Sequence, residues 1–122
     1  MSDNQKIENC INLYYEGCCE SDPLKIKEAF DKNAMISGYL PDGLHEMNLD
    51  KFAGFVEAQK PSPKEKGENV VYEILSCDIQ GATAAIKVRD KYLGITFVDT
   101  LSFIKIENEW KIYNKLFHVE SE

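Results

Sequence analysis

The sequence lacks the residue patterns of metal and redox sites. Its four cysteines, Cys10, Cys18, Cys19 and Cys77, form no C-x-x-C pair, and its two histidines lie far from them. Neither a zinc site nor a thioredoxin-like site is therefore predicted. We expect four reduced thiols, with Cys10 and Cys18 as small core residues. No metal ion and no cofactor are expected.

Positive charge is also scarce. The chain has 14 basic and 21 acidic residues, a net charge of −7, and its lysines are scattered. Such a surface repels a nucleic-acid backbone. Residues 1–10 lack the charged-then-apolar layout of a signal peptide, and no stretch approaches the roughly 20 apolar residues of a membrane span. We therefore expect a cytoplasmic protein that binds neither nucleic acid nor membranes.

The chain has enough apolar residues to form one hydrophobic core. Its 122 residues are typical of one domain, so a single domain over residues 1–122 is predicted. The apolar share is 43%, and there are six Phe, six Tyr and one Trp. This composition excludes a disordered chain, because a disordered chain has too few apolar residues to offset the entropy of ordering.

Three helices are predicted from capping residues and apolar spacing. Ser2 and Gln5 fit a capping box at the start of a helix over about residues 3–20. Asp22-Pro23 begins a short second helix. Asn48 caps a third helix, which ends before Pro61.

The remaining segments indicate strands. Residues 34–40 and 44–47 flank a Pro-Asp-Gly turn and predict a short hairpin. After a polar loop at residues 61–69, three or four antiparallel strands follow over residues 70–119. The sum is an α+β domain in which the helices cover one face of a strongly curved antiparallel sheet.

The turn at Leu93-Gly94 sets one of the expected strand registers. If Leu93-Gly94 is a two-residue turn, Val88 lies opposite Asp99 and Asp90 lies opposite Phe97. The turn at Gly81 is ambiguous by one residue, which leaves the register of residues 70–80 open.

The last hairpin is expected to turn at Asn108-Glu109. Glu107 then pairs with Trp110, and Asp99 lies opposite His118. The face toward the core would comprise Phe97, Asp99, Leu101, Phe103, Trp110, Ile112, Asn114, Leu116 and His118. The opposite face, with Val98, Tyr113 and Phe117, is mixed and suits a half-exposed or partner-covered surface.

Asp99 and His118 are the candidate catalytic residues. The expected register places them side by side on an otherwise apolar face, where the carboxylate could orient the imidazole as a general acid or base. Two alternatives remain: the residues form a buried polar pair without a chemical role, or His118 lies in solvent near the chain end.

Other side chains are candidates for ligand binding. Asp90 and Asn114 are polar groups on the expected inner face, and Tyr14 could place its hydroxyl in the same space. An apolar wall for a flat ligand is expected from Phe55, Phe97, Phe103 and Trp110, although core packing explains these residues equally well. His45 is expected at the surface or the pocket rim.

Several short segments carry a likeness to a known family. They are Tyr14-Tyr15-Glu16-Gly17, Ala29-Phe30, Asn33-Ala34, residues 97–105 and residues 110–115. In their order along nearly the whole chain they resemble the nuclear transport factor 2-like superfamily, and within it the "putative lumazine-binding" proteins. The resemblance implies a cone-shaped fold, a pocket between the helices and the concave sheet face, and commonly a homodimer through the outer sheet face. No motif of the related ketosteroid isomerases or cyclases is matched, so their catalytic residues do not transfer.

Two functions are compatible with these features. The first is a small-molecule-binding domain with an apolar pocket, and with it a cofactor-independent acid–base enzyme of the isomerase, dehydratase or cyclase type that acts on a ring compound. The alternative is a non-catalytic homodimeric protein-interaction module that uses the mixed outer face. The sequence does not identify the ligand.

Overall fold

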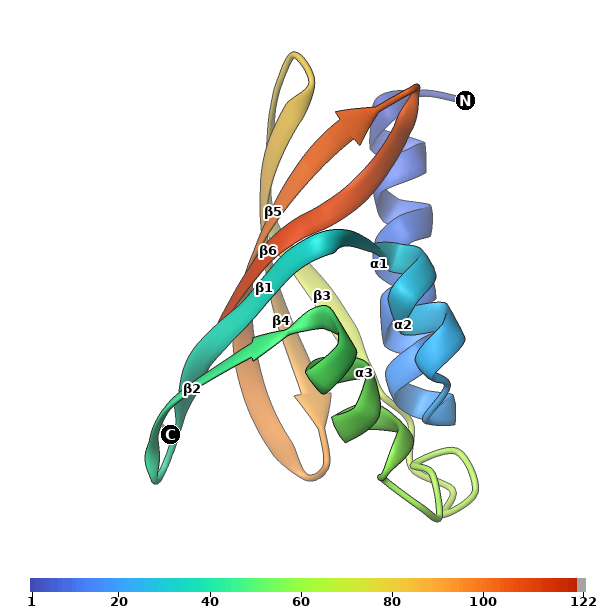
Figure 1. Cartoon of the computed structure of the whole chain (residues 1–122), viewed down its shortest axis with the longest axis vertical. Coiled ribbons are helices and arrows are strands. Elements are labelled where there is room, and N and C mark those ends of the chain that lie inside the picture. Colours follow the sequence, from blue (N-terminus) through green and yellow to red (C-terminus); the bar gives the residue numbers. More distant parts are fainter. Residues whose placement is uncertain (121–122) are drawn as a thin grey trace.

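Three helices lie against one face of a six-stranded sheet in the computed structural model, which describes residues 1–120 (Figure 1). The elements are α1 (Asp3–Glu20), α2 (Pro23–Ala29), β1 (Phe30–Leu40), β2 (Gly43–Asn48), α3 (Leu49–Glu57), β3 (Tyr72–Gln80), β4 (Thr83–Tyr92), β5 (Ile95–Ile106) and β6 (Glu109–Val119). The predicted α+β class and the element order are confirmed. No helix in the described part of the chain is long and apolar enough to cross a membrane.

The helices begin at the predicted capping residues. The Ser2 hydroxyl accepts a hydrogen bond from the backbone N–H of Gln5, and the Asn48 side chain accepts one from Lys51. Asp22 likewise caps α2, with Pro23 at the first helical position. Each cap satisfies backbone donors that have no partner within the helix, so these boundaries follow from local sequence.

The sheet order is β2-β1-β6-β5-β4-β3. All neighbours are antiparallel except β1 and β6, which pair in parallel and bring the first strand against the last. The sheet is twisted but not strongly curled (Figure 1). The expected strong curvature is therefore not confirmed.

The turn at Leu93-Gly94 has the predicted register. Val88 pairs with Asp99 and Asp90 pairs with Phe97. The open register of β3 is also resolved, because Tyr72 pairs with Asp90 while Glu73 is exposed.

The predicted register between β5 and β6 is wrong. The two central turn residues are Glu107 and Asn108, both with positive φ (50° and 69°), as a tight hairpin turn requires. Trp110 therefore pairs with Lys105 rather than with Glu107. Further along, Tyr113 is an extra residue in β6, because Phe103 pairs with Ile112 while Ser102 pairs with Asn114.

This bulge exchanges the two faces of the second half of β6. Because side chains alternate along a strand, one added residue turns every later side chain to the opposite face. Lys115 and Phe117 are consequently buried, whereas Asn114, Leu116 and His118 are exposed on the outer face. Asp99 lies opposite Phe117 instead of His118.

Gly38 in β1 makes room for the repositioned Phe117. The two residues are partners in the parallel β1–β6 ladder. A Cβ atom on Gly38 would overlap the Phe117 carbonyl oxygen and ring. The absence of a side chain at position 38 thus lets the Phe117 ring lie over the inner face of the sheet.

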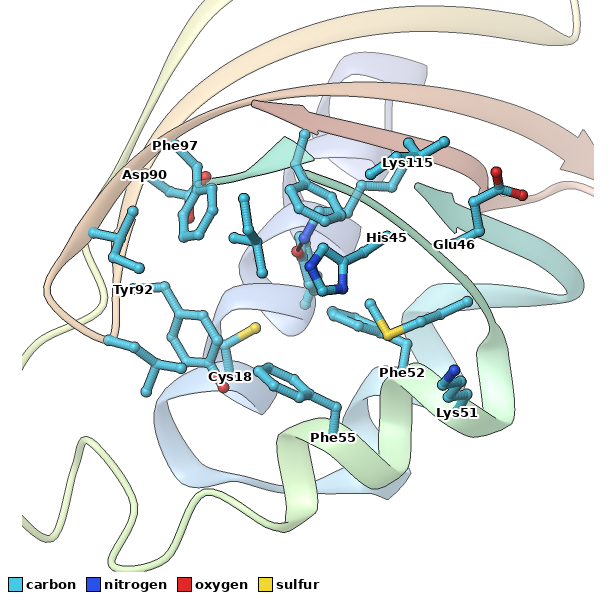
Figure 2. Close-up of a pocket in the computed structure, with 17 residues that line it drawn as sticks. Cys18, His45, Glu46, Lys51, Phe52, Phe55, Asp90, Tyr92, Phe97 and Lys115 are labelled. Atoms are coloured by element: carbon cyan, nitrogen blue, oxygen red, sulfur yellow. Dashed lines mark hydrogen bonds between the residues drawn. The ribbon is translucent and has the colours of Figure 1, made fainter. Parts of the chain in front are cut away.

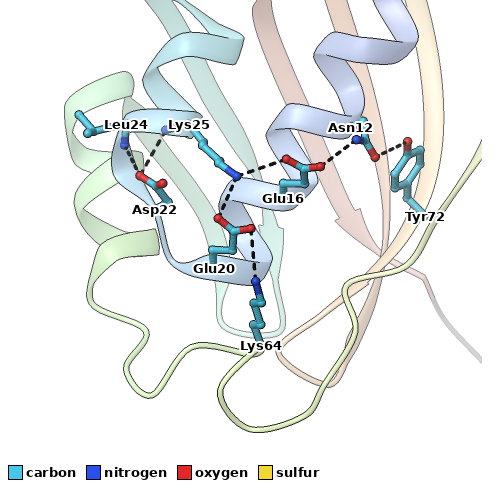
Figure 3. A network of polar contacts seen from close by, with 8 residues as sticks. All are labelled: Asn12, Glu16, Glu20, Asp22, Leu24, Lys25, Lys64 and Tyr72. Carbon is cyan, nitrogen blue, oxygen red and sulfur yellow. Dashed lines mark hydrogen bonds and ion pairs between the residues drawn. The ribbon is translucent and has the colours of Figure 1, made fainter.

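A chain of polar contacts joins the helices to the loop before β3 (Figure 3). Lys25 pairs with Glu16 and Glu20 at 3.3 and 2.9 Å, and Glu20 also reaches Lys64 at 3.9 Å. Each pair is partly exposed and contributes little alone. Together they link the end of α1 to α2 and to the loop.

Candidate functional site

A pocket of about 700 Å³ lies between the helices and the inner face of the sheet (Figure 2). Most of its lining is apolar, and it is contributed by α1, the β1–β2 hairpin, α3, the β4–β5 hairpin and β6. The lining residues are Tyr14, Cys18, Leu40, Leu44, His45, Glu46, Met47, Lys51, Phe52, Phe55, Asp90, Tyr92, Leu93, Ile95, Phe97, Lys115 and Phe117.

Lys115 is the buried cation of this pocket. Its residue exposure is 8%, and its ammonium nitrogen lies 4.8, 5.0 and 5.4 Å from the ring centroids of Phe52, Tyr14 and Phe117. The ammonium group also donates a hydrogen bond to the Tyr14 hydroxyl. Aromatic faces attract cations, so the three rings replace part of the hydration that Lys115 loses on burial.

Two aspartates accompany Lys115. Asp99 is 0% exposed, and its Oδ2 atom accepts a 2.8 Å hydrogen bond from the Tyr15 hydroxyl. The same Oδ2 atom lies 3.9 Å from Lys115 Nζ. Asp90, which is 5% exposed, has its Oδ1 atom 3.4 Å from the Tyr15 hydroxyl. The Tyr15 hydroxyl therefore lies between the two carboxyl groups.

Burial, reinforced by the neighbouring Asp99 charge, raises the pKa of Asp90 from 3.8 to about 9. Asp90 is consequently protonated at neutral pH, and as the protonated partner it is the hydrogen-bond donor toward the Asp99 side chain. Asp99 Oδ1 is buried and has no hydrogen-bond partner among the described residues. With Asp90 neutral, the Lys115 and Asp99 charges balance, and the inner end of the pocket has no net charge.

The other titratable groups near Lys115 remain neutral. Burial raises the pKa of the Cys18 thiol to about 12 and also raises the pKa of the Tyr14 hydroxyl. A thiol with such a pKa is a poor nucleophile, since the thiolate is the reactive form. Across residues 1–120, no group of three or more His, Cys, Asp or Glu side chains is placed to hold a metal ion.

The structure brings four of the predicted ligand-binding residues to the pocket: Tyr14, Phe55, Asp90 and Phe97. His45 lies at the pocket as well, with Nε2 2.7 Å from Asp42.

The other predicted site residues lie elsewhere. Phe103 and Trp110 are core residues outside the pocket lining, and Trp110 Nε1 donates to Asp3 at 2.9 Å. Asn114 and His118 are on the outer face because of the bulge, and the His118 ring lies 5.8 Å from that of Tyr39. The expected pairing of Asp99 with His118 is therefore wrong.

Lys115 and Tyr15 are the site residues that the sequence reasoning missed. One signal was available for Lys115. After Ile112, the residues predicted to face the core include one apolar side chain, Leu116. The alternate positions of the same strand include two, Phe117 and Val119. A bulge after Ile112 would have given the more apolar inner face, with Lys115 as its polar member.

Comparisons with known proteins agree with this architecture. A family model described as "Putative lumazine-binding" matches residues 2–118. None of the curated proteins matches the chain.

Solved structures provide further matches. A nuclear transport factor 2-like protein of unknown function from Silicibacter pomeroyi is 20% identical, with 98% of this chain and 100% of that chain covered and a TM-score of 0.86. One from Methylobacillus flagellatus is 25% identical over 99% and 96% of the two chains, with a TM-score of 0.84. A domain with a cystatin-like fold from Nostoc punctiforme is 12% identical, covers 98% of this chain and 78% of that chain, and has a TM-score of 0.78. These likenesses show the fold.

Proposed function

The chain belongs to the "Putative lumazine-binding" family of the nuclear transport factor 2-like superfamily, and from this premise we propose that it binds a small ring compound in its pocket. The observation that carries the proposal is the combination of an apolar cavity of about 700 Å³ with a polar inner end formed by Lys115, Asp90 and Tyr14.

The pocket has the features of small-molecule sites. Such sites measure roughly 300–1,000 Å³ and combine apolar walls with a few polar groups that orient the ligand. Phe52, Phe55 and Phe97 supply aromatic walls from α3 and β5 (Figure 2). Burial of a ring between them would gain about 25 cal/mol for each Å² of apolar surface removed from water.

Occupying the pocket with a side chain tests this proposal. Met47 lines the pocket and Met35 lies exposed on the outer face, so Met47→Trp and Met35→Trp are matched substitutions. A thermal-shift screen would use lumazine, riboflavin, progesterone and 2-acetylnaphthalene. We expect at least one compound to raise the melting temperature of the wild type and of Met35→Trp but not of Met47→Trp.

A melting-temperature shift that survives in Met47→Trp would place the binding site outside the pocket. An absence of any shift, across compounds of such different shapes, would remove the support for a ring-binding pocket.

The raised pKa of the buried Asp90 carboxyl group supports an acid–base activity at the same site. A buried carboxylic acid that remains protonated at neutral pH can act as a general acid. The activity would be of the isomerase, dehydratase or cyclase type and would use no cofactor. Its catalytic group would be Asp90, which lines the pocket, with Asp99 buried beside it as a positioning residue. His118 is not part of this site, because it lies on the opposite face of the sheet.

A second candidate function is homodimerisation through the outer sheet face. Leu116, Tyr113, Tyr39 and Met35 on β1 and β6 form an exposed apolar stripe, with Leu116 53% exposed. Phe117 is not part of this surface, contrary to the sequence-based expectation, because it is buried and lines the pocket. Exposed apolar stripes of this kind are typical of protein–protein interfaces.

Sedimentation velocity tests the dimer. Leu116→Arg is expected to convert a dimer to a monomer, because it places a charge in the apolar stripe. Leu24→Arg is the control, since Leu24 is also an exposed leucine but lies on α2. A wild-type protein that sediments as a monomer at all accessible concentrations would contradict the proposal.

The proposal also includes a single functional domain over residues 1–122 and a cytoplasmic location. All four cysteines, Cys10, Cys18, Cys19 and Cys77, are free thiols. Free thiols are the usual state in a reducing compartment.

A further inference from the structure

The Lys115 ammonium group has more hydrogen-bond donors than the surrounding protein satisfies. An ammonium group carries three N–H donors. Among the described residues it has one hydrogen-bond acceptor, the Tyr14 hydroxyl. The Asp99 oxygen at 3.9 Å lies beyond hydrogen-bond distance. Because unpaired donors are costly in apolar surroundings, an acceptor on the pocket side would stabilise Lys115.

The charge on that acceptor is constrained by the neighbouring carboxyl groups. Lys115 already has a counter-charge in Asp99, and Asp90 holds a proton. A neutral ligand preserves this balance. An anionic ligand would add an uncompensated charge beside the rings of Phe52, Phe117 and Tyr14, whose faces attract cations and repel anions.

We propose that the pocket selects a neutral ring compound carrying a carbonyl oxygen, and that this oxygen accepts a hydrogen bond from Lys115. The inference rests on the proposed small-molecule function and adds the chemical class of the ligand. Lys115 extends from β6 into the pocket, and Phe52 and Phe55 on α3 supply the apolar surface for the ring (Figure 2).

Three naphthalene probes of nearly equal size test the class. 2-Acetylnaphthalene has a neutral carbonyl oxygen, 2-naphthoate is an anion, and 2-ethylnaphthalene has no acceptor. Their own fluorescence allows titration of the wild-type protein at neutral pH. We expect 2-acetylnaphthalene to bind about tenfold more tightly than 2-ethylnaphthalene, as a hydrogen bond from a charged donor implies. The anion is expected to bind more weakly than the ketone.

Substitutions at position 115 test whether Lys115 causes the preference for the ketone over the hydrocarbon. In Lys115→Met the preference for ketone over hydrocarbon should disappear while the hydrocarbon still binds. Because Lys115→Met leaves Asp99 without its counter-charge, the comparison is repeated in Lys115→Met/Asp99→Asn, which restores the charge balance. Lys111→Met is the control, since Lys111 lies on the same strand outside the pocket lining and contacts the Glu28 carbonyl oxygen. This control should keep the tenfold preference.

The outcomes separate this inference from the proposed function. Equal affinities of the wild type for ketone and hydrocarbon would overturn the inference and leave a ring-binding pocket. Tightest binding of 2-naphthoate would also overturn it, in favour of an anionic ligand. If none of the three probes binds and the thermal-shift screen is negative too, both proposals fail.

Discussion

Lys115→Met should lower the free energy of unfolding by about 3–5 kcal/mol, the range for removing one partner of a buried ion pair. Asp99 is fully buried, with its Oδ2 atom 3.9 Å from Lys115 Nζ and hydrogen-bonded to the Tyr15 hydroxyl. Without the cation, Asp99 must either remain an uncompensated buried charge or take up a proton on folding. Urea unfolding of the wild type and the variant measures the loss.

A double-mutant cycle identifies the cause. Lys115→Met/Asp99→Asn removes both charges and should be more stable than Lys115→Met alone, although it also lacks the native hydrogen bond between Lys115 and Tyr14. We expect strong coupling between positions 99 and 115, because Lys115 Nζ and Asp99 Oδ2 are 3.9 Å apart. Additive effects of the two substitutions would show that the charges do not interact in the folded protein.

Asp90→Asn should make stability less dependent on pH. The amide keeps a donor for Asp99 but cannot ionise. In the wild type, the pKa of Asp90 is raised from 3.8 in the unfolded chain to about 9 in the fold. Between these values the folded state holds one more proton than the unfolded state, so stability falls as pH rises. The maximal slope for one proton is about 1.4 kcal/mol per pH unit.

Melting temperatures across this pH range provide the measurement. The stability of Asp90→Asn relative to the wild type should increase steadily from acidic to alkaline pH. Asp78→Asn is the control, because Asp78 is exposed on β3, and its curve should follow that of the wild type. Parallel curves for Asp90→Asn and the wild type would mean that Asp90 is ionised in the folded protein.

The parts of the fold that depend on local chemistry were predictable from the sequence. Ser2, Asp22 and Asn48 cap helices through their own side chains. Leu93 and Gly94 form a two-residue turn with φ of 54° and 77°, which set the β4–β5 register and placed Asp90 inward. Each of these features is decided by neighbouring residues, so an isolated sequence carries the information.

The candidate site was only half predictable, because its centre depends on contacts between distant segments. β6 pairs with β5 and also, in parallel, with β1, where Gly38 accommodates the Phe117 ring. The bulge at Tyr113 turns Lys115 and Phe117 to the inner face while β6 stays paired with both β1 and β5. Simple alternation along β6 therefore predicted His118 on the inner face, whereas in the structure Lys115 faces inward.

The most direct test of the account is a crystal structure of the protein with 2-acetylnaphthalene. We predict the rings between Phe52 and Phe97 inside the pocket, with the carbonyl oxygen about 3 Å from Lys115 Nζ, as a hydrogen bond requires. Compound bound on the outer face near Leu116, or bound in the pocket with its oxygen turned away from Lys115, would contradict the central claim that Lys115 orients a neutral ring ligand.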